Sequence, residues 1–220
     1  MAGMIARLIW NRRNESVHGK DPRHPNSILV KAKEDLRLYH LVQSKERSNG
    51  AVVCPNLVQK WKKPPAGKLK LNWDAAINAS VGVIGMGGLV RDCQGRVLGS
   101  VRANRKLKLS PLDAEAYALL VASQFCKDSG LSELVLEGDS MQVVLKMKNS
   151  VRDWSQASLI LEEAKSILNS FTSWKIEHTK RDANMAAHLL AKDALNVVDD
   201  IFDLESIPDC IKSAVLSDSM

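Results

Sequence analysis

Residues 68–74 read Lys-Leu-Lys-Leu-Asn-Trp-Asp, and polar and apolar side chains alternate along them. A period of two is typical of a β-strand that buries one face. Two more strand-like segments follow at 81–90, which is rich in glycine and valine, and at 97–102, and a short turn that contains Gly95 separates them. Because the connections are short, we expect these three strands to pair antiparallel in chain order.

The chain after these strands alternates between helical and strand patterns. Ser110 and Pro111 suit the N-cap and first position of a helix that continues to Gly130. We expect the remaining elements in this order: a strand at 134–139, helices at 140–147 and 157–171, a strand at 174–178 and a helix at 184–195. A right-handed crossover into the fourth strand makes part of the sheet parallel. The prediction is an α/β fold with a mixed five-stranded sheet and helices on both faces.

The chain divides by composition into three parts. Residues 1–67 are basic, with two amphipathic helices expected within 1–20 and 27–41 and a turn-rich linker that ends at the consecutive prolines 64 and 65. Residues 68–195 carry the α/β pattern and form the predicted domain. Residues 196–220 are a tail that mixes acidic and apolar side chains.

Charge is distributed unevenly between these parts. The net charge is +6, with 13 basic and five acidic residues before Lys68 (+8) and 18 basic and 20 acidic residues from there on (−2). A basic segment suits a polyanionic partner. No apolar run is long enough to span a membrane and no secretory signal is evident, so an intracellular protein is expected, in the nucleus or the cytoplasm. The four scattered cysteines predict neither a zinc site nor disulfide-linked partners.

Three acids stand where secondary-structure elements can bring them together. Asp74 follows the first strand, Glu115 lies in the helix after the three strands, and Asp139 ends the apolar fourth strand. Because these positions can converge, the three acids are more than a run of surface charge.

Four motifs around these acids resemble the ribonuclease H superfamily, and specifically the ribonuclease H-like domains of plant non-LTR retroelements and their free-standing relatives. They are Leu-Asn-Trp-Asp-Ala-Ala (71–76), Asp-Ala-Glu-Ala-Tyr-Ala-Leu-Leu (113–120), Leu-Glu-Gly-Asp-Ser (136–140) and Lys-Arg-Asp-Ala-Asn-Met-Ala-Ala-His-Leu-Leu-Ala-Lys (180–192). Residues 9–17 also resemble the segment that precedes this domain in retroelement polyproteins.

The resemblance implies metal-dependent hydrolysis of the RNA strand in RNA–DNA hybrids by two Mg²⁺ (or Mn²⁺) ions. Asp74 would bridge both ions, and Glu115 and Asp139 would each complete one. Hard divalent cations prefer oxygen ligands, and two ions about 3.5–4 Å apart can clamp a phosphodiester displacement.

His188 occupies the position where this superfamily usually has a fourth catalytic acid. Imidazole is a poor ligand for Mg²⁺ but an acceptable one for Mn²⁺, so we expect any activity to be reduced and to favour Mn²⁺. Asp193 lies five residues further along the predicted helix, on a different face, and cannot replace the missing acid. Asp182 precedes the helix and could reach inward.

Other polar residues have auxiliary roles in this hypothesis. His178 could assist product or proton release, although it also suits an ordinary strand position. Asn184 and Ser140 suit helix N-caps, and Asn72 could orient the site. Candidates for nucleic-acid contact are Asn72, Arg102, Arg105, Lys106, Lys108, Lys180, Arg181 and Asn184. The glycines Gly82, Gly85, Gly87 and Gly88 suggest close backbone approach to a minor groove, or a bulge.

Two alternative functions remain open at this level. A chain that has lost the fourth acid could bind nucleic acid without cleaving it. The predicted N-terminal helices together with the tail at 197–220 could instead serve as a protein–protein scaffold. The sequence gives no indication of oligomeric state.

Overall fold

The computed structural model describes residues 59–149 and 154–218. The chain forms two compact units, 1–57 and 58–220, and all described residues belong to the second. The two helices predicted within 1–41 and the retroelement-like segment 9–17 lie outside the described residues. Within those residues, no helix is both long and apolar enough to cross a membrane.

The described residues form a mixed six-stranded sheet with the order β5-β4-β1-β2-β3-β6. The first three strands pair antiparallel as predicted, and β4 and β5 add in parallel beside β1. The strands are β1 (Leu69–Asn78), β2 (Val83–Arg91), β3 (Val97–Arg105), β4 (Glu133–Gly138), β5 (Ser173–His178) and β6 (Ile201–Leu204). The prediction of five strands was wrong by one, because β6 comes from the segment interpreted as a tail.

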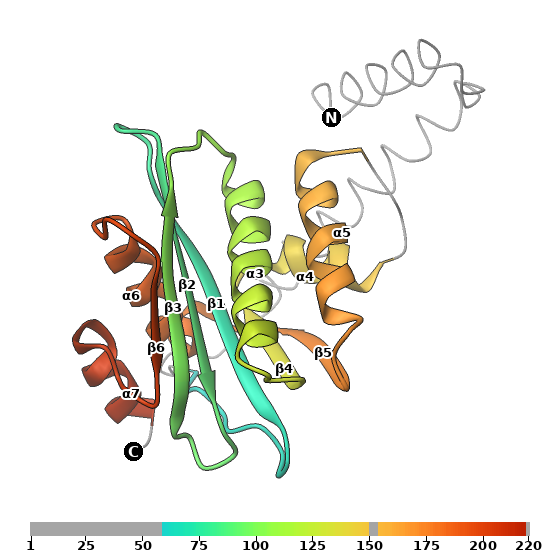
Figure 1. Ribbon diagram of the computed structural model, residues 1–220, viewed down its shortest axis with the longest axis vertical. Coiled ribbons are helices and arrows are strands. Elements are labelled where there is room, and N and C mark those ends of the chain that lie inside the picture. The colour runs from blue at the N-terminus through green and yellow to red at the C-terminus, as the bar shows by residue number, and fades with distance from the viewer. Residues whose placement is uncertain (1–58, 150–153, 219–220) are drawn as a thin grey trace, which may run out of the picture. The chain divides into compact units, whose positions relative to one another are not determined.

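Helices cover both faces of the sheet, as predicted (Figure 1). One face carries α3 (Pro111–Asp128), with α5 (Gln156–Leu168) packed on it and α4 (Met141–Lys148) between α5 and β5. The other face carries α6 (Met185–Ala194), preceded by the short 3-10 turn η1 (Arg181–Asn184) and followed by η2 (Asp209–Ile211) and α7 (Lys212–Asp218).

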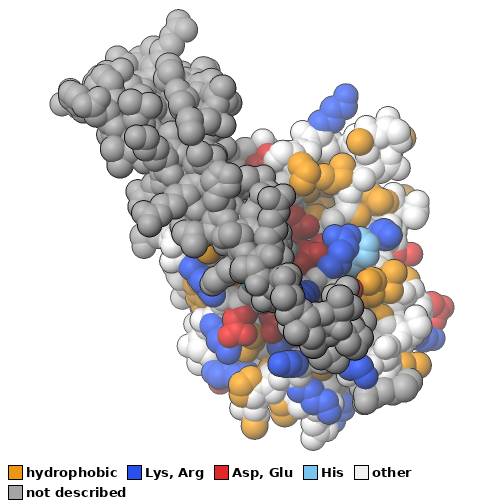
Figure 2. Space-filling model, turned by 180° about the vertical axis from the view of Figure 1, so that it is seen from behind, with side chains coloured by type: hydrophobic (Ala, Val, Ile, Leu, Met, Phe, Trp, Pro, Cys, Tyr) orange, Lys and Arg blue, Asp and Glu red, His pale blue; other side chains and the backbone are white. Residues whose placement is uncertain are grey.

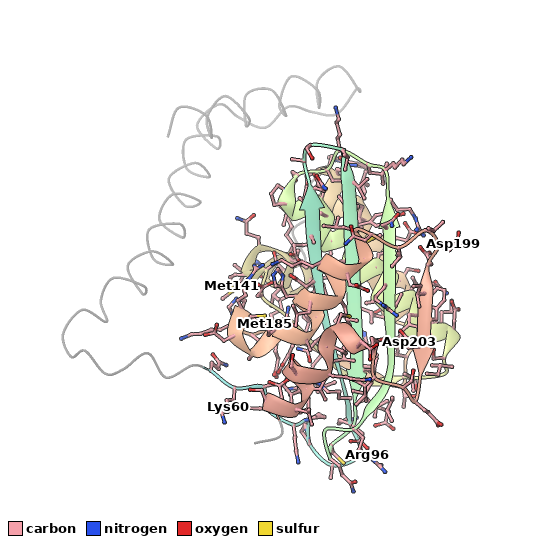
Figure 3. All side chains as sticks on the ribbon, turned by 90° about the vertical axis from the view of Figure 1, so that its left-hand side faces the viewer. Lys60, Arg96, Met141, Met185, Asp199 and Asp203 are labelled. Carbon is pink, nitrogen blue, oxygen red and sulfur yellow. The ribbon has the colours of Figure 1, made fainter. Side chains whose placement is uncertain are left out.

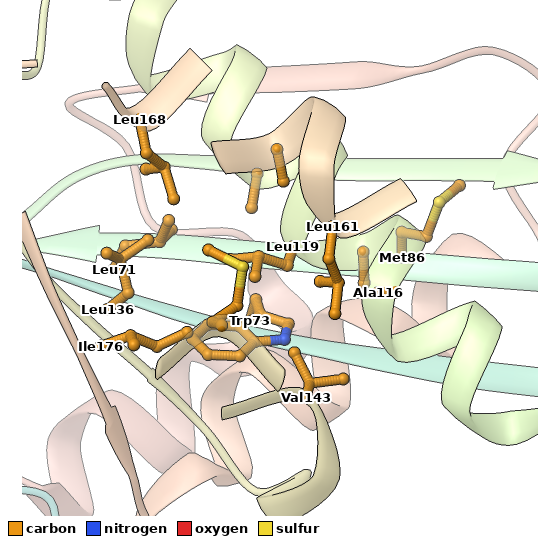
Figure 4. Packing of buried hydrophobic residues seen from close by; sticks show 14 of the residues in the cluster. Leu71, Trp73, Met86, Ala116, Leu119, Leu136, Val143, Leu161, Leu168 and Ile176 are labelled. Atoms are coloured by element: carbon orange, nitrogen blue, oxygen red, sulfur yellow. The ribbon is translucent and has the colours of Figure 1, made fainter. Parts of the chain in front are cut away.

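Alternation along β1 separates two environments. Leu71 and Trp73 point into the larger core under α3, α4 and α5, where they meet Leu136 and Leu119 (Figure 4). Asn72 and Asp74, offset by one residue, are buried on the α6 side. The pleat that buries the tryptophan therefore turns Asp74 toward α6.

The start of α3 follows its sequence signals closely. Ser110 is the N-cap and its hydroxyl accepts a hydrogen bond from the Asp113 backbone N–H, with Pro111 in the first turn. The helix ends two residues before Gly130, whose φ is +69°. This capping sets which residues of α3 face the sheet, and so places Glu115 in the second turn.

Close packing of α6 explains two of the glycines in β2. A Cβ atom at Gly85 would lie 2.3 Å from the Ala191 carbonyl oxygen, and one at Gly87 would lie 2.4 Å from the Ala191 nitrogen. The expectation that these glycines serve a minor groove was therefore wrong: their backbone is approached by α6. The β-bulge lies further along, between Val90 and Arg91.

The C-terminal segment completes the sheet and the second core. Strand β6 pairs antiparallel with β3, from Gly99 opposite Leu204 to Arg102 opposite Ile201. Ile211 and Val215 pack with Leu89 and Leu190 in the core beneath α6. Figure 3 shows α6 lying over the sheet with Met185 at its start and Asp203 on β6.

Candidate metal centre

The position of Asp74 follows from where two parallel strands separate. Pairing of β1 with β4 ends at Asn72 opposite Glu137, whereas β1 continues to Asn78 beside β2. The sequence pattern placed Asp74 at the end of the first strand. In the structure, Asp74 lies inside β1. Asp139 directly follows β4, so it comes to the same place along the sheet.

Glu115 reaches this place from α3. One ligand atom from each of Asp74, Glu115 and Asp139 lies within 4.8 Å of the others, and we call these three residues the acidic cluster. Three segments far apart in the sequence thus meet as predicted. Figure 2 shows the side of the molecule on which acidic, basic and histidine side chains lie next to one another.

The acidic cluster is electrostatically costly without a cation. Burial, and then the negative charge of Asp139, raises the pKa of Asp74, and the hydrogen bond from His188 only partly opposes this. Burial together with the charges of Asp74 and Asp139 raises the pKa of Glu115 to about 9. Like charges close together in a desolvated place disfavour ionisation, and a bound cation would relieve that cost.

Two buried oxygens show that the cluster fits a divalent metal ion. Oδ1 of Asp74 and Oε2 of Glu115 have no hydrogen-bond partner among the described residues. Buried polar atoms are nearly always paired, so such orphans call for an explanation. Carboxylate oxygens are the ligands that Mg²⁺ and Mn²⁺ prefer, and a cation at this place would satisfy both atoms.

His188 lies on α6 directly against the cluster. Its Nδ1 is 2.7 Å from Oδ2 of Asp74, and the imidazole is buried. The sequence prediction that this position faces the acids is therefore reproduced by the geometry. Asp193 instead pairs with Arg102 at 2.6 Å, and Asp182 is exposed, so neither stands in for the missing acid.

Two further side chains flank Asp139. Nη1 of Arg181 lies 3.4 Å from Oδ2 of Asp139, and its Nη2 lies 2.9 Å and 3.1 Å from the two ring nitrogens of His188. Nε2 of His178 lies 3.1 Å from the backbone oxygen of Asp139. The structure thus brings both residues to the rim of the acidic cluster.

The family described as reverse transcriptase-like matches residues 72–194. This chain belongs to that family. The match includes every member of the acidic cluster and His188, so the reverse transcriptase-like region contains the whole candidate centre.

One curated relative and several solved structures resemble this reverse transcriptase-like chain. A protein of Arabidopsis thaliana, provisionally named a ribonuclease H protein, is 26% identical over 160 residues, which are 73% of this chain. The matched part spans only about a quarter (26%) of that relative's length.

The solved structures show the ribonuclease H-like fold. RNase H1 from the halophilic archaeon Halobacterium salinarum is 24% identical with a TM-score of 0.55, covering 59% of this chain and 98% of that one. LC11-RNase H1, solved in complex with an RNA/DNA hybrid, is 20% identical with a TM-score of 0.53, covering 59% of this chain and 97% of that one. These likenesses confirm the predicted ribonuclease H-like fold.

Two asparagines connect β1 of the reverse transcriptase-like domain to the start of α6. Nδ2 of Asn72 donates to Oδ1 of Asn184 at 3.2 Å, and Nδ2 of Asn184 donates to the Trp73 carbonyl at 2.9 Å. Asn184 is at the N-cap position of α6, but its side chain makes no capping hydrogen bond, and neither does Ser140 at α4. The predicted capping role of these two side chains was wrong.

A buried tryptophan and arginine behind Asn72 were missed by the sequence reasoning. The indole Nε1 of Trp61 donates to Oδ1 of Asn72 at 2.9 Å. The Arg91 guanidinium lies 3.5 Å from the Trp61 ring centroid, donates to the same oxygen at 3.3 Å and pairs with Asp218 at 2.6 Å. The sequence signal that could have revealed this burial was a tryptophan within the polar linker before Lys68, because such a side chain rarely stays in solvent.

The basic candidates for nucleic-acid contact fall into two groups. Arg102 pairs with Asp193 and Asp203, and Arg105 pairs with Asp200, so the C-terminal segment neutralises both. The structure does not bring them to the acidic cluster. Lys106, Lys108 and Lys180 are exposed, and of these Lys180 directly precedes η1, beside the cluster.

Proposed function

We propose that this chain is a ribonuclease H-type nuclease that hydrolyses the RNA strand of RNA–DNA hybrids with the help of Mg²⁺ or Mn²⁺. The observation that supports it most is the convergence of Asp74, Glu115 and Asp139 within 4.8 Å, with a buried, unpartnered oxygen on each of the first two. The solved relative that was crystallised with an RNA/DNA hybrid has the same fold.

The acidic cluster would hold the metal, which when bound supplies Lewis acidity at the scissile phosphodiester. Arg181 lies at the rim, where its guanidinium can bind a phosphate oxygen next to Asp139. His178 and Lys180 are exposed on the same side and would contact the nucleic-acid backbone. Asn72 and Asn184 hold β1 and the start of α6 together and so position Asp74 opposite His188.

His188 weakens this centre compared with a site that has four carboxylates. The imidazole supplies no negative charge, and its Nδ1 already contacts Asp74. We therefore expect slow cleavage that is faster in Mn²⁺ than in Mg²⁺. This same contact supports the second candidate function, a nucleic-acid-binding module that retains the fold without turnover.

The test is cleavage of a labelled RNA–DNA hybrid by the purified full chain, in Mg²⁺ and in Mn²⁺. We expect Asp74→Asn to abolish cleavage and His188→Asp to increase it at least about tenfold in Mg²⁺, which corresponds to about 1.4 kcal/mol of barrier. Glu177→Gln is the matched control, because this acid lies on β5 and pairs with Lys175.

Each outcome separates the candidate functions. Cleavage lost in Asp74→Asn and kept in Glu177→Gln supports the nuclease. Hybrid binding without cleavage by any variant supports the binding module. Neither binding nor cleavage would contradict both proposals.

A further inference from the structure

We propose that the Arg181 guanidinium, held in place by His188, occupies the part of this centre where a second cation would bind, so that the acidic cluster takes a single divalent ion. The proposal rests on the function proposed above and specifies its metal stoichiometry. The number of bound ions proposed here, one, differs from the two ions that the resemblance to ribonuclease H implies.

The two carboxylate oxygens of Asp74 have different surroundings. Oδ2 lies 2.7 Å from Nδ1 of His188, whereas Oδ1 is buried without a hydrogen-bond partner among the described residues. The contact with His188 occupies one lone-pair direction of Oδ2, so this oxygen offers less to a second cation than Oδ1 does. Oε2 of Glu115 is likewise buried without a hydrogen-bond partner among the described residues.

His188 connects Asp74 to Arg181. Nδ1 of His188 lies 2.7 Å from Oδ2 of Asp74, and Nη2 of Arg181 lies 2.9 Å from Nδ1 and 3.1 Å from Nε2. The guanidinium therefore lies against both ring nitrogens of the histidine that contacts Asp74. His188 acts in this arrangement as a positioning residue for Arg181.

Arg181 also reaches the second side of the cluster. Its Nη1 lies 3.4 Å from Oδ2 of Asp139, so one guanidinium contacts both Asp139 and the histidine that contacts Asp74. Its side chain is 57% exposed, which means that it enters the site from solvent without being part of the core. A planar, permanently charged group in this position provides a fixed positive charge.

The formal charges balance for one ion. When all three carboxylates are ionised, the acidic cluster carries −3, and Arg181 reduces this to −2. A single divalent cation neutralises that remainder, whereas two would leave a buried excess of positive charge. Uncompensated charge in a desolvated place is strongly unfavourable.

Counting bound Mn²⁺ tests this stoichiometry directly. The full chain is titrated with MnCl₂, and free Mn²⁺ is measured by its electron paramagnetic resonance signal. We expect one tightly bound ion for the wild type and a second ion for the double variant Arg181→Gln/His188→Asp. Far-UV circular dichroism of the same samples verifies that the double variant is folded.

A single substitution on the surface provides an independent measurement. Arg181→Gln removes the positive charge that lies 3.4 Å from Oδ2 of Asp139, so Mn²⁺ should bind about tenfold or more tightly. Lys180→Gln removes a charge from the neighbouring exposed residue that makes no contact with the cluster, and should change the dissociation constant by less than about threefold.

Several results would overturn the proposal. These are two ions bound by the wild type, none bound by it, or an unchanged dissociation constant in Arg181→Gln. Hybrid cleavage by the same samples separates this proposal from the proposed function. Cleavage with two ions bound refutes the stoichiometry alone, and one ion bound without cleavage refutes the nuclease function alone.

Discussion

A Cβ atom on Gly87 would lie 2.4 Å from the backbone nitrogen of Ala191, so β2 and α6 touch through their main chains. Because α6 carries His188, this contact fixes how far the imidazole stands from Asp74 on the neighbouring strand. The distance between a glycine and a helix thus determines the geometry of a candidate metal centre.

Gly87→Ala should therefore move α6 or unfold the domain. The clash is with backbone atoms that cannot rotate away, so we expect a loss of about 3 kcal/mol or more in the free energy of unfolding. Gly130→Ala is the control: it has open space around it but a φ of +69°, and should cost only about 1 kcal/mol. Urea denaturation measures both, and equal losses would contradict the packing argument.

The raised pKa of Glu115 predicts how stability depends on pH in the absence of metal. Its folded pKa is about 9 and the ordinary pKa of a glutamate is 4.5, so between these values the folded state holds a proton that the unfolded state has released. Stability therefore falls as the pH rises through this window. Thermal unfolding in EDTA should show a lower Tm at pH 9 than at pH 6, and Glu115→Gln should reduce that difference.

Metal binding should reverse this trend, because the carboxylates must be ionised to coordinate. At a Mn²⁺ concentration about 100 times the dissociation constant, the native state should gain about 2.7 kcal/mol. The same scans with Mn²⁺ should therefore show the larger gain in Tm at the higher pH, below the point where Mn²⁺ precipitates. An equal gain at both pH values would be evidence against ligation by Glu115.

Replacement of Trp61 should destabilise the domain even though it precedes the first strand. The side chain is 5% exposed, stacks on Arg91 and donates to Asn72, so Trp61→Ala should cost about 3–5 kcal/mol. Trp61→Phe keeps an aromatic face over Arg91 and loses the indole N–H, and should cost about 1–2 kcal/mol. A smaller cost for alanine than for phenylalanine would disprove this account of the contact.

Asn184→Ala should lower both stability and cleavage. The substitution leaves the Trp73 carbonyl and Nδ2 of Asn72 without their partner, which should cost about 1–3 kcal/mol. It also loosens the turn that carries Arg181 and leads to His188. Asn78→Ala, at the half-buried far end of the same β1 strand, should change stability by less than about 0.5 kcal/mol. Chemical denaturation and hybrid cleavage of the two variants provide the comparison.

Local patterns predicted most of the fold and the acids of the site. The alternation in 68–74, the cap at Ser110 and the apolar run before Asp139 each act over a few residues, and each element formed within a few residues of its expected position. The motif order also indicated that Asp74, Glu115 and Asp139 would meet, because parallel and antiparallel pairing around one central strand permits few arrangements.

The features that sequence reasoning missed depend on distant partners. Four residues, Ile-Phe-Asp-Leu (201–204), are too few for a periodic signal, and they form β6 only because β3 has a free edge. The side chain of Asn184 bonds to β1 and leaves the helix end uncapped, because the buried Trp73 carbonyl needs a donor. Similarly, Asp203 and Asp200, which pair with Arg102 and Arg105, lie 101 and 95 residues away in the sequence, in the segment interpreted as a tail.

Pairing of β6 with β3 also bears on how the protein behaves at high concentration. Without β6, the nine-residue strand β3 would present a row of unpaired backbone N–H and C=O groups at the margin of the sheet. Long exposed margins of this kind recruit strands from other molecules and promote aggregation. A chain shortened to end before Ile201 would thus be prone to self-association. By pairing with β3, the C-terminal segment protects the protein against this aggregation.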